Sequence, residues 1–490
     1  MADCVVVGGG LGGLAAAIRL RARGENVLLL EQGERLGGKC NRREREGFVF
    51  DTGPSVLTMP FVLDELFAAA GRERADYLTL EPVEPGCQYR FADGTVFEAP
   101  GTLAAFEEAV ARTFPGEERG FARFMDYTRK LWEISGSAFL FHPLGAGLLR
   151  RLDWRKAISG LAALRPTRMH REVRRYFRDP RLIQLFDRFA TYNGSDPYRT
   201  PATFNVISYV ELAFGSWRCR GGMYELVEAL ERLAREIGVE VRTGAGVERL
   251  EFANAEKVSA LHLAEGERIA TNRVVLNADA LTALTGSLMA DHPNAQRWQR
   301  RFSHREASGS GYVLLMALER RFPELAVHNV LFSDDYPREF REIFSHPTAP
   351  HDPTLYIHIP GRHEPSFAPE GKEGWFVLIN APSTDRLPDW PTDYPERLLA
   401  RLSERLAPLG FRAADIRWHE ARSPHYFAHE YSAWRGSLYG ASSNNPLAAF
   451  LRVRNAGPCE NLAFAGGSAH PGGGIPLVLL SGKMAAESLA

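Results

Sequence analysis

The amino end of the chain alternates short apolar runs with one glycine-rich turn. The run Cys4–Val7 predicts a buried strand, and residues 12–23, after the turn, predict a helix. A second apolar run, Val27–Leu30, predicts a strand that ends on Glu31. Together these segments predict one β-α-β unit, in which the alanines at 15–17 let the helix lie close to the sheet.

The rest of the apolar pattern divides into helical and strand-like regions. Helical spacing covers residues 106–113, 121–132 and 225–237. Short apolar runs predict strands at 240–243, 247–252, 258–263 and 274–276. Three more runs are separated by loops rich in Pro, Gly and His, which is typical of an antiparallel sheet: 312–318, 355–359 and 375–379. The chain closes with a strand at 462–465, a dense glycine turn and a helix from about Leu477.

Only the two ends of the chain have the strand, glycine turn, helix form. We therefore expect the α/β class, with a discontinuous nucleotide-binding domain and a second, α+β domain inserted twice. The nucleotide-binding parts are expected at residues 1–90, 216–285 and 451–490. The inserted parts are expected at 91–215 and 286–450, the latter with the antiparallel sheet.

Composition places the chain among folded globular proteins. Of its 490 residues, 45% are apolar and 24% charged, which excludes a disordered or fibrous chain. Lys and Arg number 59 against 60 Asp and Glu, so the net charge of −1 argues against a nucleic-acid partner. No apolar stretch is long enough to span a bilayer, no signal peptide is visible, and five scattered cysteines fit a reducing cytosol. We therefore expect a cytoplasmic protein.

The first glycine turn carries the strongest chemical signal. Gly8, Gly10 and Gly13 form the pattern G-x-G-x-x-G, with Leu11 inside it. The first glycine permits a tight turn, the second lets backbone N–H groups approach a pyrophosphate, and the third lets the helix pack on the strand. The helix N-terminus favours phosphate, and Glu31 can hold ribose hydroxyls. The sequence therefore predicts a Rossmann-like dinucleotide site.

Two further turns favour FAD over NAD. The residues after Glu31 can pass close to the phosphate and ribitol of FAD, although a glycine pair here also suits an ordinary surface turn: Arg35, Gly37, Gly38 and Lys39. Another tight turn follows at Gly53, Pro54 and Ser55.

The densest glycine cluster, residues 464–476, lies between the last strand and the last helix. A helix N-terminus aimed at a flavin would stabilise negative charge on the reduced ring. His470 is the only ionisable side chain in this turn and is our candidate catalytic residue, the alternative being a histidine that hydrogen-bonds the loop backbone. No H-E-x-x-H pattern or closely spaced cysteine pair predicts a metal site.

Motifs from both ends and the middle resemble the bacterial-type carotenoid desaturases, the phytoene-desaturase-like FAD oxidoreductases. They are the segments 8–13 with Glu31, 35–39, 50–55, 189–198, 220–224, 277–279, 367–371 and 466–483. The resemblance implies an FAD-binding domain of the GDI or p-hydroxybenzoate-hydroxylase type and an inserted substrate domain with a hydrophobic tunnel. It implies that Val247 touches the adenine, and that Gly467 and Ile475 border the ribitol and the flavin.

The resemblance also implies an activity, the removal of hydrogen from adjacent carbons of a C30 or C40 polyene. The motifs look nearest to the branch that acts on hydroxylated carotenoids at the 3,4 bond, with phytoene and diapophytoene desaturation as rivals. A flavin amine oxidase and a non-catalytic, GDI-like lipid carrier are the alternatives. Because the chain has only one dinucleotide fingerprint, we expect oxygen or a quinone to reoxidise the flavin.

Residues 150–181 form a strongly basic segment. Eleven Lys or Arg side chains face three acidic ones, with aromatic and aliphatic residues between them. A solvated helix face explains such a run by itself, but an enzyme with a lipid substrate must reach a bilayer. We therefore expect peripheral membrane association through this segment.

Overall fold

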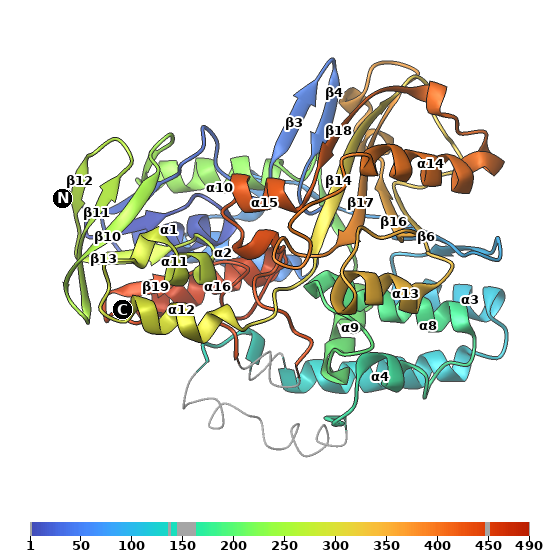
Figure 1. Ribbon diagram of the computed structural model, residues 1–490, viewed down its shortest axis with the longest axis horizontal. Helices are drawn as coiled ribbons and strands as arrows, with labels where there is room; N and C mark the ends of the chain where they lie inside the picture. The colour runs from blue at the N-terminus through green and yellow to red at the C-terminus, as the bar shows by residue number, and fades with distance from the viewer. Residues whose placement is uncertain (1, 136–138, 145–162, 446–450, 490) are drawn as a thin grey trace.

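The computed structural model describes residues 2–135, 139–144, 163–445 and 451–489. Two layered parts lie side by side (Figure 1), and both chain termini lie in the part built on the parallel sheet. The α/β class and the discontinuous architecture predicted from the sequence are confirmed, since that sheet takes strands from both ends and the middle of the chain. No helix in these ranges is long and apolar enough to cross a bilayer.

The first part contains a five-stranded parallel sheet in the order β19-β13-β1-β2-β9. Its strands are β1 Cys4–Val7, β2 Val27–Leu30, β9 Glu240–Arg242, β13 Arg273–Leu276 and β19 Leu462–Phe464. Parallel strands need crossover connections, so the second domain can be inserted between them without disturbing the sheet.

Alternate side chains of the parallel strands enter two different cores. Val6 and Leu29 pack on the face covered by helices, whereas Val5 and Leu28 pack on the opposite face. The helices are α1 Leu11–Ala22, α2 Pro60–Ala69, α10 Glu225–Glu236 and α16 Ile475–Ser488. The opposite face is covered by an antiparallel sheet and two helices: β10 Val247–Asn254, β11 Lys257–Leu263, β12 Arg268–Ala270, α11 Ala280–Thr285 and α12 Ala295–Ser303.

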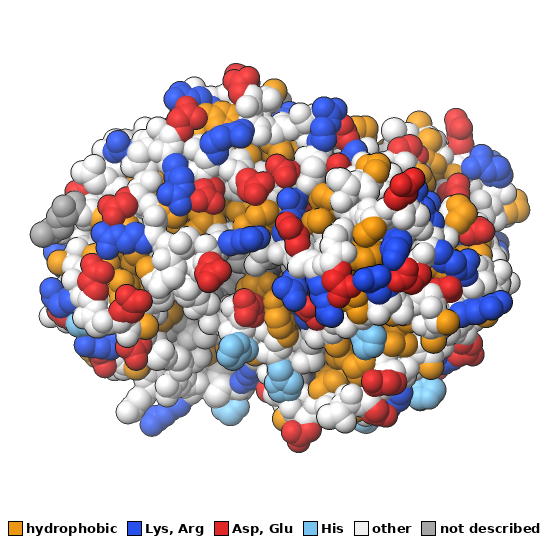
Figure 2. All heavy atoms as spheres, turned by 90° about the horizontal axis from the view of Figure 1, so that it is seen from above, with side chains coloured by type: hydrophobic (Ala, Val, Ile, Leu, Met, Phe, Trp, Pro, Cys, Tyr) orange, Lys and Arg blue, Asp and Glu red, His pale blue; other side chains and the backbone are white. Residues whose placement is uncertain are grey.

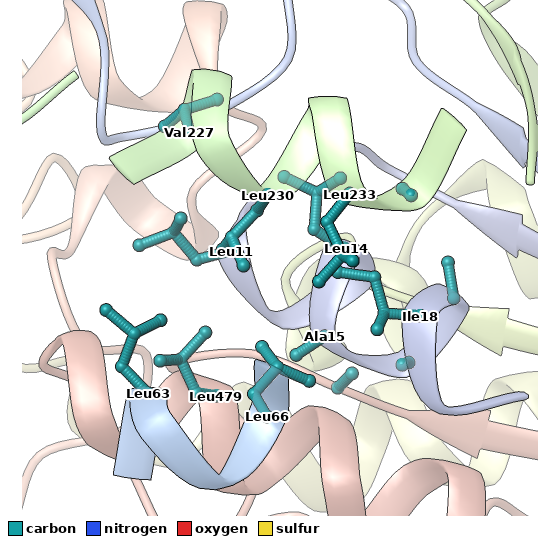
Figure 3. Packing of buried hydrophobic residues seen from close by; sticks show 14 of the residues in the cluster. Leu11, Leu14, Ala15, Ile18, Leu63, Leu66, Val227, Leu230, Leu233 and Leu479 are labelled. Carbon is teal, nitrogen blue, oxygen red and sulfur yellow. The ribbon is translucent and has the colours of Figure 1, made fainter. Parts of the chain in front are cut away.

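Helix α1 lies between α10 and the pair α2 and α16 (Figure 3). Leu14 and Leu230 belong to this core, and Leu479 contributes from the last helix. The approach of α16 to α1 requires glycine, because a Cβ on Gly482 would lie 2.4 Å from the carbonyl oxygen of Gly12. The first and last helices therefore start near each other at the same edge of the sheet.

The second part contains a seven-stranded sheet in the order β18-β14-β17-β16-β15-β6-β7. Its strands are β6 Cys87–Arg90, β7 Val96–Ala99, β14 Ser310–Leu318, β15 His328–Leu331, β16 Leu355–His358, β17 Glu373–Ala381 and β18 Ile416–Arg422. All pairs are antiparallel except β6 with β15.

Strands β6 and β7 were not predicted, and β6 falls inside residues 1–90, the expected first nucleotide-binding part. They form a hairpin in which the apolar Cys87, Tyr89 and Phe91 alternate with Gln88 and Arg90, a strand pattern that our prediction did not use. The structure places β6 in the seven-stranded sheet, because Tyr89 is buried against the helical core of the second part.

The seven-stranded sheet is covered differently on its two faces. On one face it packs against α14 Tyr394–Leu406. On the other, the β6 end packs against a group of helices: α3 Leu103–Thr113, α4 Glu118–Ser135, α7 Met169–Val173, α8 Pro180–Asp187, α9 Val206–Phe214 and α13 Tyr336–Phe340. Two small sheets and a helix complete the chain: β3 Arg42–Arg45 with β4 Phe48–Asp51, β5 Leu80–Pro82 with β8 Trp217–Cys219, and α15 Pro424–Glu430.

Candidate functional site

A continuous cavity of about 2860 Å³ extends from the parallel sheet to the seven-stranded sheet. At its first end it touches the carboxyl ends of the parallel strands, at Val7, Leu30, Asn277 and Gly466. Ligands of open α/β sheets bind at this edge. One chamber thus joins the predicted dinucleotide site to the second domain.

The first glycine turn is shaped by contacts that only glycine allows. Gly8 has φ +100°, and a Cβ on Gly13 would lie 2.1 Å from the carbonyl oxygen of Gly8. A Cβ on Gly10 would lie 2.6 Å from Oδ1 of Asn277. Helix α1 therefore begins directly against β1, with its N-terminus at the cavity.

Glu31 follows β2 and lines the cavity. Its Oε2 accepts a hydrogen bond from the Gly9 N–H at 2.7 Å, and its Oε1 accepts one from the Gly33 N–H at 2.8 Å. These two bonds hold the carboxylate in place, and each oxygen keeps acceptor capacity for a ribose hydroxyl.

The second glycine pair packs against the first turn. Gly37 bridges to Gly10, and its N–H donates to the carbonyl of Gly9 at 2.9 Å. Gly37 has φ +117° and Gly38 has φ +58°, conformations that favour glycine. The pair thus closes the loop over the nucleotide turn.

Lys39, which follows this pair, is buried in the cavity wall and donates from Nζ to the carbonyl of Leu438 at 2.8 Å. Burial lowers the pKa of Lys39, and the nearby Asp279 opposes this effect. The same burial raises the pKa of Asp279, while Lys39 lowers it. The direct contacts of Lys39 thus tie the loop after the glycine pair to residues 437 and 438, and Asp279 acts on it only through its charge.

Ser55 lies where the cavity passes from the first part to the second. Its hydroxyl hydrogen-bonds the Tyr356 hydroxyl on β16, at 2.5 Å. The Tyr356 hydroxyl also contacts Nδ1 of His328 on β15, at 2.8 Å. All three residues line the cavity, so a polar chain crosses from the turn at 53–55 to the seven-stranded sheet.

The last glycine turn brings a second helix N-terminus to the cavity. Gly474 precedes α16 with φ +101°, and Gly467 and Ile475 line the cavity. Arg452 is buried here and donates to the carbonyl of Gly467 at 3.0 Å. The Ser468 hydroxyl accepts a hydrogen bond from the Ala280 N–H at 2.8 Å, so it also serves the fold.

His470 lies behind this turn and is not among the residues that line the cavity. Its side chain is fully buried, and Nε2 contacts the carbonyl oxygens of Phe139 and His142 at 3.0 and 2.9 Å. Burial lowers the pKa of His470 to about 4. The neutral ring thus contacts backbone carbonyls of residues 139–142 and not those of its own turn, and its catalytic role stays a prediction.

The buried His470 ring predicts a pH-dependent contribution to stability. An unfolded histidine binds a proton near pH 6.5, whereas folded His470 resists protonation until about pH 4. Its contribution is therefore present above pH 6.5 and is lost as the pH falls. From pH 7 to pH 5 the loss is about 2 kcal/mol. Urea unfolding at both pH values should show that drop in the wild type relative to His470→Gln, and equal pH dependence in the two proteins would contradict it.

All predicted cofactor-binding residues line this one cavity except Gly13, which packs the helix on the strand. They are Gly8, Gly10, Leu11, Glu31, Arg35, Gly37, Gly38, Lys39, Gly53, Pro54, Ser55, Val247, Gly467 and Ile475. Residues separated by more than 400 positions are thereby brought to a single chamber.

Sequence reasoning assigned no role to Asn277, although it lies between the two glycine turns. Its Nδ2 donates to the carbonyl of Ala465 at 3.0 Å, and its side chain lies next to Gly10 and Gly12. The signal was present, because Asn277 is the polar residue directly after β13, the strand between β19 and β1. Such residues lie at the ligand-binding edge of a parallel sheet.

The far part of the cavity is largely apolar. Its walls come from α4, α9 and one face of the seven-stranded sheet, with aliphatic and aromatic side chains at Leu131, Val206, Ile207, Val210, Val313, Phe376 and Leu378. This surface suits a long apolar ligand, whose binding comes from burial at about 25 cal/mol per Å².

Residues 150–162 of the basic segment lie outside the described residues. In the described remainder, Arg165 and Arg175 pair with Glu172, and Arg181 pairs with Asp179. Figure 2 shows Lys and Arg interspersed with Asp and Glu over the face seen from above. Those three arginines therefore form ion pairs within the second part.

The chain was compared with known proteins. Residues 11–490 match the family described as flavin containing amine oxidoreductase. A 1-hydroxycarotenoid 3,4-desaturase of Flavobacterium sp. is 34% identical, covering 99% of both chains. A zeta-carotene-forming phytoene desaturase of Myxococcus xanthus is 36% identical, covering 99% of this chain and 93% of that protein. Cyclohexylamine oxidase from Brevibacterium oxydans shares the fold, with a TM-score of 0.62 at 18% identity over 100% of this chain and 98% of that one.

The family match and these two relatives each extend over nearly the whole chain, and so do the motifs that predicted the resemblance. The chain belongs to the flavin-containing amine oxidoreductase family and, within it, to the carotenoid desaturases.

Proposed function

We propose that this protein is an FAD-dependent desaturase of carotenoids. One observation carries the proposal: a single cavity joins a glycine-lined dinucleotide site to a long apolar chamber, in a chain that carotenoid desaturases match from end to end. The residues present suit FAD, because Gly10 allows the close approach of the turn to Asn277 and two backbone N–H groups hold the Glu31 carboxylate at the end of β2, where a ribose can bind.

The reaction removes a hydride and a proton from neighbouring carbons, and a C=C bond forms between them. Bound FAD supplies the two-electron acceptor for the hydride. The chain itself binds the cofactor through its glycine turns and Glu31, and the apolar walls bury the polyene and exclude water.

Expression in a host that makes phytoene tests the function. Extracts should contain polyenes with longer chromophores, and the purified protein should be yellow, with a flavin that an added polyene bleaches without oxygen. A flavoprotein that leaves every polyene unchanged would contradict the proposal.

Neither alternative function is favoured. The amine oxidases resemble this chain at 15–18% identity, which shows a shared fold, whereas the carotenoid enzymes named above match at 34–36%. A GDI-like lipid carrier needs no flavin, so the glycine-lined nucleotide turn argues against it. Release of peroxide from an amine would support the amine oxidase, and a colourless purified protein would support the lipid carrier.

We further propose oxygen or a quinone as the electron acceptor. The chain carries one dinucleotide fingerprint, and FAD occupies its place. Stopped-flow mixing of reduced protein with each acceptor tests this, and faster reoxidation by NAD(P)⁺ would contradict it.

Membrane association through residues 150–181 is expected to depend on charge. Each basic residue near an anionic surface contributes about 1 kcal/mol, so reversing four should weaken vesicle binding at least about 100-fold. The variant changes Arg150, Arg151, Arg155 and Lys156 to Glu, and co-sedimentation with phosphatidylserine vesicles measures the effect. The control reverses four exposed arginines elsewhere: Arg297, Arg300, Arg397 and Arg412. Equal binding of the two variants would contradict the proposal.

A further inference from the structure

Two of the ionisable side chains that line the cavity, Arg188 and Glu211, stand out among its apolar residues. Arg188 begins the short helix Arg188–Asn193, and Glu211 lies on α9 among Val206, Ile207 and Val210. Arg188 is only 8% exposed. A hydrocarbon ligand has no polar atom to offer either group, and burying a charge without a partner is costly. A chamber that binds only a hydrocarbon therefore does not explain why Arg188 and Glu211 line it.

The hydrogen bonds recorded for the Arg188 guanidinium come from one of its nitrogens. Nη2 donates to the hydroxyls of Tyr89 at 2.7 Å and Tyr192 at 3.0 Å. The guanidinium carbon lies 5.1 Å and 5.0 Å from the same two ring centroids, so the rings also hold it by cation–π contact. Within the part of the chain that the structure describes, buried Nε donates to no group. The cation is thus fixed in place with donor capacity to spare.

Glu211 is linked to this cation through a tyrosine. Its carboxyl interacts with the Tyr192 hydroxyl, and burial raises the pKa of Glu211 while Arg188 lowers it. Among the described residues there is no direct ion pair between Arg188 and Glu211. Tyr192 bridges the two, and both charged groups line the cavity. An acceptor and a donor therefore line the same cavity, with the hydroxyl of Tyr192 between them.

The subsite lies close to the polar chain at the junction of the two parts. Tyr89, whose hydroxyl accepts a hydrogen bond from Arg188, lies on β6 opposite Val330 of β15, the strand that carries His328. Tyr356 lies opposite the same Val330 from the other side, on β16, and is hydrogen-bonded to Ser55. Because Ser55 belongs to the turn predicted to lie by the flavin ring, a group held at the subsite would be near the reacting carbons.

We propose that Arg188, Tyr192 and Glu211 form a subsite for an oxygen substituent, most simply a hydroxyl, on the end of the polyene substrate. The hydroxyl donates to Glu211 and accepts from Arg188. This inference rests on the proposed function and makes it more specific, since it selects a hydroxylated polyene over a hydrocarbon. A substrate anchored at its oxygen presents one bond to the cofactor, a few carbons from that end.

Two matched probes test the subsite: an acyclic carotenoid with a terminal hydroxyl and the same polyene without it. The rate at which each probe reduces the protein-bound FAD in the absence of oxygen gives kcat/KM for that probe. We expect the wild type to favour the hydroxylated probe by about 10- to 100-fold, the usual effect of a hydrogen bond to a charged group. Glu211→Gln should bring this ratio close to one, whereas Glu265→Gln, an exposed control, should keep it.

A second variant distinguishes the loss of the subsite from a folding defect. Tyr192→Phe keeps the ring and removes the hydroxyl between the two charges, so it should also lower the ratio. Flavin absorbance and the thermal midpoint of each variant report whether it is folded. A wild-type ratio near one, or a ratio that both folded variants leave unchanged, would overturn the subsite while the desaturase function stands. If neither probe reduces the flavin, the result contradicts both the proposed function and the subsite.

Discussion

Gly13→Ala is expected to remove FAD from the protein and to destabilise it. The added Cβ would lie 2.1 Å from the carbonyl oxygen of Gly8, a backbone atom within the turn. Helix α1 would have to move away from β1, at a cost of about 1–3 kcal/mol for overpacking. The same shift displaces the helix N-terminus from the pyrophosphate, and each 1.4 kcal/mol lost lowers affinity about tenfold. Flavin content per mole of purified protein and the midpoint of thermal unfolding measure both effects.

The matched control for this change is Gly361→Ala. Gly361 has no atom within 4 Å of an added Cβ and does not have a positive φ. This variant should keep its flavin and its unfolding midpoint. A Gly13→Ala protein as yellow and as stable as Gly361→Ala would show that the helix does not need to touch the strand at this point.

Glu31→Ala is expected to lower FAD affinity by at least about 100-fold. The carboxylate accepts hydrogen bonds from the N–H groups of Gly9 and Gly33 and remains open to the ribose. Its removal deletes hydrogen bonds to a charged group, each worth about 1.5–3 kcal/mol, and leaves two backbone donors without their acceptor. Titration of the flavin-free protein with FAD, followed by fluorescence, gives the affinity.

Glu248→Ala is the control for the Glu31 substitution, because Glu248 is an exposed glutamate on the neighbouring strand β10. Its affinity for FAD should equal that of the wild type. If Glu31→Ala also bound FAD with wild-type affinity, other groups would have to hold the adenosine, and Glu31 would not be a cofactor-binding residue.

Much of the fold could be predicted because its signals are local. The strands Cys4–Val7 and Val27–Leu30 have the predicted bounds, and the helix predicted at 225–237 is α10. The hairpin of β6 and β7 was missed although Gln88 and Glu98 occupy the polar positions of an alternating pattern, because the segment is short. Its strand character comes from pairing with β15, more than two hundred residues away, which no local pattern contains.

The residues that line the cavity also divide into those that a local sequence pattern predicts and those that it does not. Glycine turns are visible in a sequence because the conformations they need exclude most other residues, so the turns led to most of the residues predicted to bind FAD, and those residues line one cavity except Gly13. Tyr356, His328 and Arg188 carry no comparable motif. Their meeting depends on strands and helices from separate segments packing around one chamber.

By itself the sequence determined the nucleotide turn, the acid on the next strand and the membership of a flavin family, because each depends on a few residues in a short span. Only the tertiary structure decided that His470 points away from the cavity and that Arg188 and Glu211 face into it. The direction of a side chain is set by packing on all sides, and those neighbours come from the whole chain. The subsite that we propose for Arg188, Tyr192 and Glu211 could therefore be inferred only from the folded protein.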